Sequence, residues 1–163
     1  MISRVASLLA CLTFAVAAAV AVGAETQGGA LGPPGYQLLT SDLMTAFIQP
    51  RHVKLWLAGK VRNWEYAAYE SHNVGGAFAR FAKAVPAYKD QSIAELTAAF
   101  VTPAITDLDL AISAKNEAGF QTAYKELTAG CNGCHQATRH EMVVIQVPSS
   151  AAFPDQVFAP PVQ

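Results

Sequence analysis

The sequence predicts an all-α protein, an antiparallel four-helix bundle with an extended C-terminal tail. Along four segments between residues 41 and 140, apolar residues recur at steps of three and four, which is the spacing of one face of a helix. No segment before the tail alternates apolar and polar residues convincingly, so strands are not expected there. Short connections between the four segments favour antiparallel neighbours.

The first helical segment is expected at about residues 41–59. Ser41 or Thr40 can cap its start, and Pro50 interrupts its pattern. An interior proline costs about 3 kcal/mol, so we expect a kink or two helices that meet near Gln49. The inward residues at helical spacing are Leu43, Met44, Phe47, Ile48, Leu55 and Trp56.

The second and third segments are expected at about residues 63–85 and 92–114. Pro86 ends the second, and Pro103 should bend the third. The inward face of the second comprises Trp64, Ala68, Ser71, Gly75, Phe78, Ala82 and Val85. The inward face of the third comprises Ile93, Leu96, Phe100, Ile105, Leu108 and Ile112.

The fourth segment begins near Asn116, a residue suited to the N-cap. Its apolar stripe runs at steps of 4, 3, 4 and 3 through Phe120, Tyr124, Leu127, Cys131 and Cys134. Both cysteines therefore continue the face that packs on the core. Whatever they bind is expected inside the bundle, between helices.

Residues 1–24 are expected to form a secretory signal peptide. Arg4 precedes an uncharged apolar stretch that ends in small residues, with cleavage expected after Ala24. The alternative is a membrane anchor, since the apolar run is nearly long enough to span a bilayer. Cleavage would remove Cys11 and leave a periplasmic chain with no membrane span. That chain would open with a flexible leader rich in Gly and Pro, residues 25–40.

The mature chain is expected to be one domain followed by a tail. It would have about 139 residues, with ten basic and twelve acidic side chains, so nothing argues for nucleic acid as the partner. The helical bundle covers residues 41–140. Residues 141–163 are rich in β-branched residues and then in proline, so they are expected to be extended and packed along the surface.

Cys131, Cys134 and His135 form a C-x-x-C-H motif, the attachment signature of haem c. Thiols one helical turn apart reach the two vinyl groups on one porphyrin edge and form thioethers, and the adjacent histidine supplies a nitrogen to the iron. A structural zinc site usually needs a second cysteine pair. A thioredoxin-type disulfide expects a βαβ context, and a structural disulfide would close only a tiny loop. One covalently bound haem c is therefore expected.

The motif lies late in the chain, because only 28 residues follow His135. His140 and Met142 are within reach of the iron by contour length. Both leave from the histidine side of the ring, however, and would have to wrap around its edge. A sixth iron ligand is therefore expected from upstream.

This arrangement resembles class II cytochromes c, the cytochrome c′ type, and exported proteobacterial cytochrome-like proteins. The haem motif followed by Arg139 is similar to that family's C-x-x-C-H-x-x-x-R ending, and Met44 in Asp-Leu-Met matches its first-helix segment facing the iron. The resemblance covers roughly residues 38–139. It implies a four-helix bundle, a role for Arg139 at a haem propionate or in packing, and often a homodimer. Pro50 and the long tail depart from the family's pattern.

Three options remain for the other face of the iron. Met44 follows the family pattern, and a thioether ligand would raise the reduction potential. His52, about two turns on, would lower the potential relative to methionine; otherwise it is a half-exposed histidine among basic residues. With no sixth ligand, an apolar pocket around Phe47 and Ile48 would leave the iron open to NO or CO.

A basic run surrounds His52 and consists of Arg51, Lys54, Lys60 and Arg62. It is interpreted as a solvated helix face or as a docking patch for an acidic redox partner. The aromatic residues beside it are expected in the core and against the haem; they are Trp56, Trp64, Tyr66 and Tyr69. His72 and His140 are expected at the surface.

The sequence therefore predicts a periplasmic monohaem cytochrome that carries single electrons between redox partner proteins, and it does not predict an enzyme. One alternative is a five-coordinate haem protein that binds or senses NO or CO. The other is a haem-containing interaction module that docks through its C-terminal tail.

Overall fold

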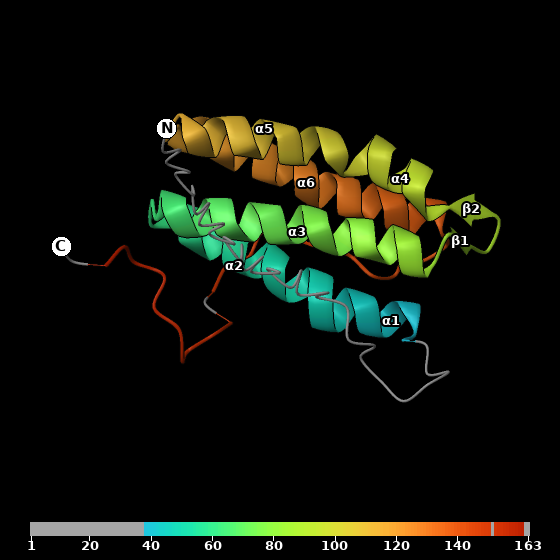
Figure 1. The fold of residues 1–163 in the computed structure, drawn as a ribbon. Helices are drawn as coiled ribbons and strands as arrows, with labels where there is room; N and C mark the ends of the chain where they lie inside the picture. The colour runs from blue at the N-terminus through green and yellow to red at the C-terminus, as the bar shows by residue number, and fades with distance from the viewer. Residues whose placement is uncertain (1–37, 151, 162–163) are drawn as a thin grey trace, which may run out of the picture. The chain divides into compact units, whose positions relative to one another are not determined.

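A computed structural model describes residues 38–150 and 152–161. All of them belong to the second of the chain's two compact units, Gln37–Gln163. The described residues are mostly helical, which confirms the all-α fold class (Figure 1). The expected signal peptide, and the expected leader up to residue 37, lie outside the described residues.

The first helical stretch runs without interruption through α1 (Thr40–Asp42), η1 (Leu43–Ile48) and α2 (Gln49–Lys60). The middle piece, η1, is a π-helix, and the N–H of Gln49 bonds back to the carbonyl of Met44. Pro50 follows in the first turn of α2, where its missing N–H costs least. The two helices expected to meet near Gln49 do so, because the π-helical turn η1 passes directly into α2 at this residue.

Helix α3 (Trp64–Ala84) begins at Asn63, whose side chain accepts a hydrogen bond from the N–H of Tyr66 at 3.2 Å. Its buried face differs in part from the expected one, because Ala68 is exposed and Ala67 is buried in its place. Tyr69, expected in the core, is 61% exposed. The helical spacing of the buried residues was therefore predicted correctly, but near the N-terminal end of α3 the buried face is shifted by one residue from the expected one.

A short antiparallel hairpin, β1 (Ala87–Tyr88) with β2 (Gln91–Ser92), separates α3 from α4. The sequence did not predict it, since strands this short hold too few residues to show alternation. Helices α4 (Ile93–Phe100) and α5 (Thr102–Ser113) follow, and they meet at a bend of 42°. Pro103 lies in the first turn of α5, so the expected bend is confirmed.

Helix α6 (Glu117–Ala137) begins at Asn116, whose side chain accepts a hydrogen bond from the N–H of Gly119 at 3.1 Å. It ends just before Arg139, which adopts a left-handed φ of 58°. A turn at residues 141–143 follows, and the described part of the tail beyond it has no regular helix or strand. It lies against the helices through Phe158, whose ring stacks on Tyr66 at 5.7 Å and whose carbonyl accepts from Asn63 at 3.0 Å.

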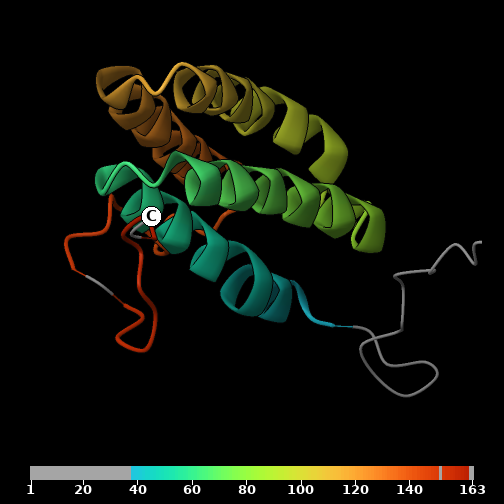
Figure 2. The same ribbon diagram turned by 60° about the vertical axis from the view of Figure 1, so that its left-hand side comes forward.

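Helix α2 packs against α3, α5 packs against α6, and α3 also packs against α5 (Figures 1 and 2). The largest fully buried side chains of the shared core are Tyr124, Phe120, Leu55, Ile93, Leu108 and Leu127. Gly130 lets α6 approach α4 closely, because a Cβ there would overlap the carbonyl of Phe100. In the part of the chain described, no single helix is long and apolar enough to cross a membrane; the bent pair of α4 and α5 passes that test only when taken together.

Candidate functional site

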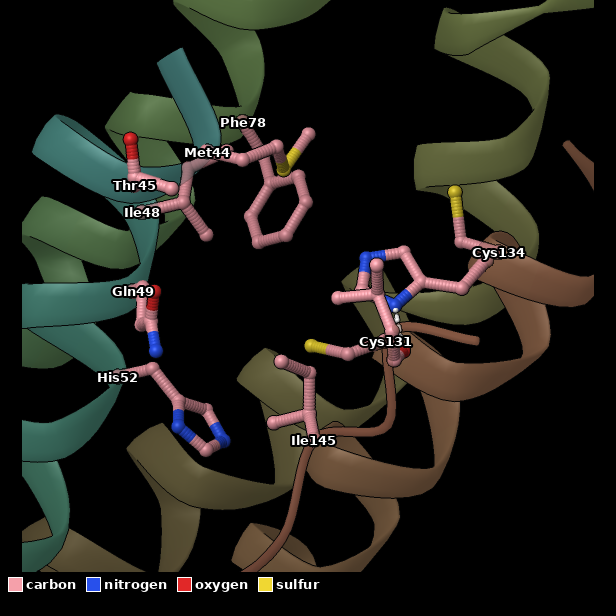
Figure 3. A pocket seen from close by; sticks show the side chains of 11 residues that line it. Met44, Thr45, Ile48, Gln49, His52, Phe78, Cys131, Cys134 and Ile145 are labelled. Carbon is pink, nitrogen blue, oxygen red and sulfur yellow. Dashed lines mark hydrogen bonds between the residues drawn. The ribbon is translucent and has the colours of Figure 1, made fainter. Parts of the chain in front are cut away.

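A pocket of about 600 Å³, including its open side, lies between the first helical stretch, α3, α6 and the tail (Figure 3). Its lining is mostly apolar, and it brings together both cysteines of the motif, the adjacent histidine and both expected distal ligands. The lining residues are Met44, Thr45, Ile48, Gln49, His52, Phe78, Cys131, Cys134, His135, Val143 and Ile145. Phe47, expected in this lining, is not part of it.

The two cysteines lie one helical turn apart on α6 and are free thiols. Figure 3 shows the sulfur of Cys131 directed into the pocket. Burial raises the pKa of the Cys131 thiol to about 12, and burial also raises the pKa of Cys134. Both thiols are therefore protonated at neutral pH, and burial disfavours the thiolate form.

His135 has one ring nitrogen committed to the tail. Its Nδ1 lies 2.6 Å from the carbonyl oxygen of Val143. Because a carbonyl can only accept, Nδ1 must carry the proton of this hydrogen bond. In the neutral ring, Nε2 is then the nitrogen with a free lone pair, which is the arrangement of a metal-binding histidine oriented by an outer partner.

Met44 belongs to the opposite wall of the pocket. It lies in the π-helical turn η1, and its side chain extends into the pocket from the wall facing Cys131 and Cys134 (Figure 3). Met44 also lines an adjoining hollow that continues past Cys134 to His140. Met44 therefore lines two hollows that Cys134 and His135 also line.

His52 is 4% exposed, so the expectation of a half-exposed histidine is wrong. Its Nε2 lies 3.1 Å from the hydroxyl oxygen of Thr128, and its Nδ1 lies 2.9 Å from the hydroxyl of Tyr124. The Thr128 hydroxyl donates to the carbonyl of Tyr124, so it accepts the bond from Nε2–H. Burial lowers the pKa of His52 to about 4. The ring is therefore neutral, and both of its nitrogens have partners on α6.

Arg139 is not brought to the pocket. Its side chain is 73% exposed and lies 3.8 Å from the carboxylate of Asp90. The basic run is also partly engaged, because Arg62 pairs with Glu117 at 2.8 Å and Lys54 lies over the ring of Phe153 at 4.8 Å.

The four aromatic residues expected against the haem do not line this pocket. Trp56 and Trp64 pack on Phe120, with ring centres 6.1 and 6.0 Å apart. Of the two histidines expected at the surface, His72 is exposed. His140 is half-buried instead, with its Nε2 3.3 Å from the hydroxyl of Tyr88.

Sequence reasoning missed three contributions to this region. Thr128 accepts a hydrogen bond from the His52 ring. The feature of the sequence that could have indicated it is its place directly after Leu127 in the apolar stripe of α6. Asn132 binds the tail at Ile145 through two hydrogen bonds of 2.9 and 2.8 Å. Val143 holds His135 through its carbonyl, and a backbone contact of this kind leaves no signal in the side-chain pattern.

Comparison of the chain with protein-family models, with curated proteins and with solved structures finds no match. The chemistry of the pocket must therefore be judged from its own residues.

Proposed function

We propose that this protein is a periplasmic monohaem c-type cytochrome of class II type, which carries single electrons between redox partner proteins. One observation carries the proposal: Cys131, Cys134 and His135 line a single apolar pocket that Met44 borders from the opposite wall. The proposal includes an antiparallel four-helix bundle, supported by the packing of α2 on α3, α5 on α6 and α3 on α5.

The residues present fit haem c. The thiols of Cys131 and Cys134 are spaced one turn apart and would each form a thioether by addition of S–H across a vinyl group. His135 would hold the iron through Nε2, since Nδ1 is bonded to the Val143 carbonyl. The bound haem would supply the iron that cycles between ferrous and ferric states. The chain's contribution is to orient the axial ligand and to exclude water with the apolar wall around Ile48.

Met44 is the better candidate for the second axial ligand. Among the described residues, the Met44 sulfur makes no hydrogen bond that ligation would break, and a sulfur ligand suits an electron carrier of raised potential. Ligation by His52 would require its ring to leave Thr128 and Tyr124. The hydroxyls of Thr128 and Tyr124 would each keep a bond to a backbone carbonyl, so giving up the two bonds to the ring would cost about 0.5–1.5 kcal/mol each.

Two measurements on the purified protein test the proposal. Intact mass should equal the mature chain plus one haem, and the absorption spectrum should be low-spin with a methionine–iron charge-transfer band in the far red. A mass without haem would contradict the proposal outright. A high-spin spectrum with rapid CO binding would replace the electron carrier with the gas-binding alternative.

A further inference from the structure

We infer that Asn132, inside the C-x-x-C-H motif, is the positioning residue for His135, because it pins the tail whose carbonyl orients the imidazole. The inference rests on the proposed function, since it concerns His135 as the axial ligand. It assigns a role to one of the two variable positions of the motif and to the tail that follows α6.

The side-chain amide of Asn132 pairs with the backbone of Ile145 in the way that a neighbouring β-strand would, through one donated and one accepted hydrogen bond. Its side-chain N–H₂ donates to the carbonyl of Ile145 at 2.9 Å, and its side-chain oxygen accepts from the N–H of the same residue at 2.8 Å. Both backbone groups of Ile145 are thereby satisfied by one side chain. Asn132 and Ile145 are both half-buried, so these bonds are partly shielded from water.

The segment between α6 and Ile145 is a compact turn fixed at both ends. The N–H of His140 donates to the carbonyl of His135 at 2.7 Å, and the N–H of Val143 donates to the carbonyl of His140 at 2.8 Å. The Asn132 pair holds the far end. Between these anchors the carbonyl of Val143 lies 2.6 Å from Nδ1 of His135. Releasing Ile145 would free the far end and let this carbonyl move away from the ring.

A hydrogen bond from Nδ1–H to a carbonyl makes the imidazole a more basic ligand, which favours the ferric state. Loss of an outer partner of this kind typically costs about 10–100-fold in metal affinity or activity. If the lower end of that loss falls on the ferric state alone, the ferric–ferrous equilibrium changes about tenfold, which corresponds to about 59 mV for a one-electron couple. The sign is a rise in reduction potential when the contact is lost.

The test uses the full-length protein with three variants. Asn132→Ala removes both bonds, Asn132→Leu removes them while retaining side-chain size, and Gln136→Ala is the control at an exposed position one turn further along α6. Hydrogen exchange at the Ile145 amide and the reduction potential are measured for each. Both Asn132 variants should speed exchange at Ile145 and raise the potential by about 59 mV, and the control should change neither.

Faster exchange at Ile145 with an unchanged potential would overturn the inference and leave Asn132 as a tail anchor alone. A normal potential in Asn132→Leu but not in Asn132→Ala would attribute the effect to packing, and would overturn it as well. If the wild-type protein carries no haem, the proposed function fails, and nitrogen NMR of the His135 ring still decides the positioning step. The Nδ1 hydrogen bond should then be present in the wild type and lost in both Asn132 variants.

Discussion

Acidification from pH 7 to pH 4.5 should destabilise this fold through His52. The ring is buried and neutral, and burial lowers its pKa from an ordinary 6.5 to about 4. Below pH 6.5 the unfolded chain protonates this histidine, whereas the folded chain resists protonation until about pH 4. Because the unfolded state binds more protons in this window, stability falls as the pH falls.

The size of the stability loss follows from the interval between the pKa of His52 in the unfolded chain, 6.5, and its pKa in the folded chain, about 4. One pKa unit corresponds to 1.36 kcal/mol, so a drop to pH 4.5 should cost roughly 2.5 kcal/mol through this one residue. Glu70 acts in the opposite direction. It is buried, and burial raises the pKa of its carboxyl group, so its contribution to stability is present at low pH and is lost as the pH rises through its folded pKa. The effect of His52 must therefore be measured as a difference between variants.

Urea unfolding at pH 7 and pH 4.5 provides the assay for wild type, His52→Leu and His72→Leu. His72 is exposed on α3 and serves as the matched control. The loss of unfolding free energy on acidification should shrink by about 2 kcal/mol in His52→Leu and stay at the wild-type value in His72→Leu. If His52→Leu and wild type lose the same free energy, His52 is not a buried neutral histidine and the reasoning fails.

Three further predictions concern the pocket and its supporting helices. Met44→Ala should abolish the far-red charge-transfer band and admit CO, whereas His52→Leu should keep the band; the reverse pattern in the absorption spectra would make His52 the ligand. Replacing both Cys131 and Cys134 by Ala should remove covalent haem from the intact mass, and covalent haem that persists would contradict the assigned attachment. Gly130→Ala should lower the unfolding free energy by about 1–3 kcal/mol in urea titrations, because the added methyl group overpacks the contact of α6 with α4. An unchanged urea midpoint would show that the two helices can move apart at this contact without loss of stability.

The helices of this protein could be predicted because their signals are local. Asn63 and Asn116 cap α3 and α6 where the apolar periodicity begins, and Pro50 marks the junction of η1 and α2. The expectation that Cys131 continues a buried stripe needed only the period of α6. Each of these inferences depends on residues within a few turns of one another.

The environment of His52 could not be predicted in the same way. Its partners Tyr124 and Thr128 are 72 and 76 residues away in the chain, and only the packing of α2 against α6 brings them together. The contact of Asn132 with Ile145 spans 13 residues and depends on the direction in which the tail leaves α6. Neither the burial of His52 nor the path of the tail is encoded in residue type or spacing near the groups concerned.

The π-helical turn η1 changes the direction in which the Met44 side chain points relative to the side chains of α2. An α-helix turns by about 100° per residue, so a widened turn holding one extra residue resets the bearing of everything before it by a similar angle. Deleting one residue between Met44 and Gln49 would restore α-helical winding and swing Met44 away from Cys131, with α2 left in place. Which side chain of this stretch faces the pocket therefore depends on the helical winding as well as on the residue type. A one-residue change in length could retune the site without altering any of the residues on α6.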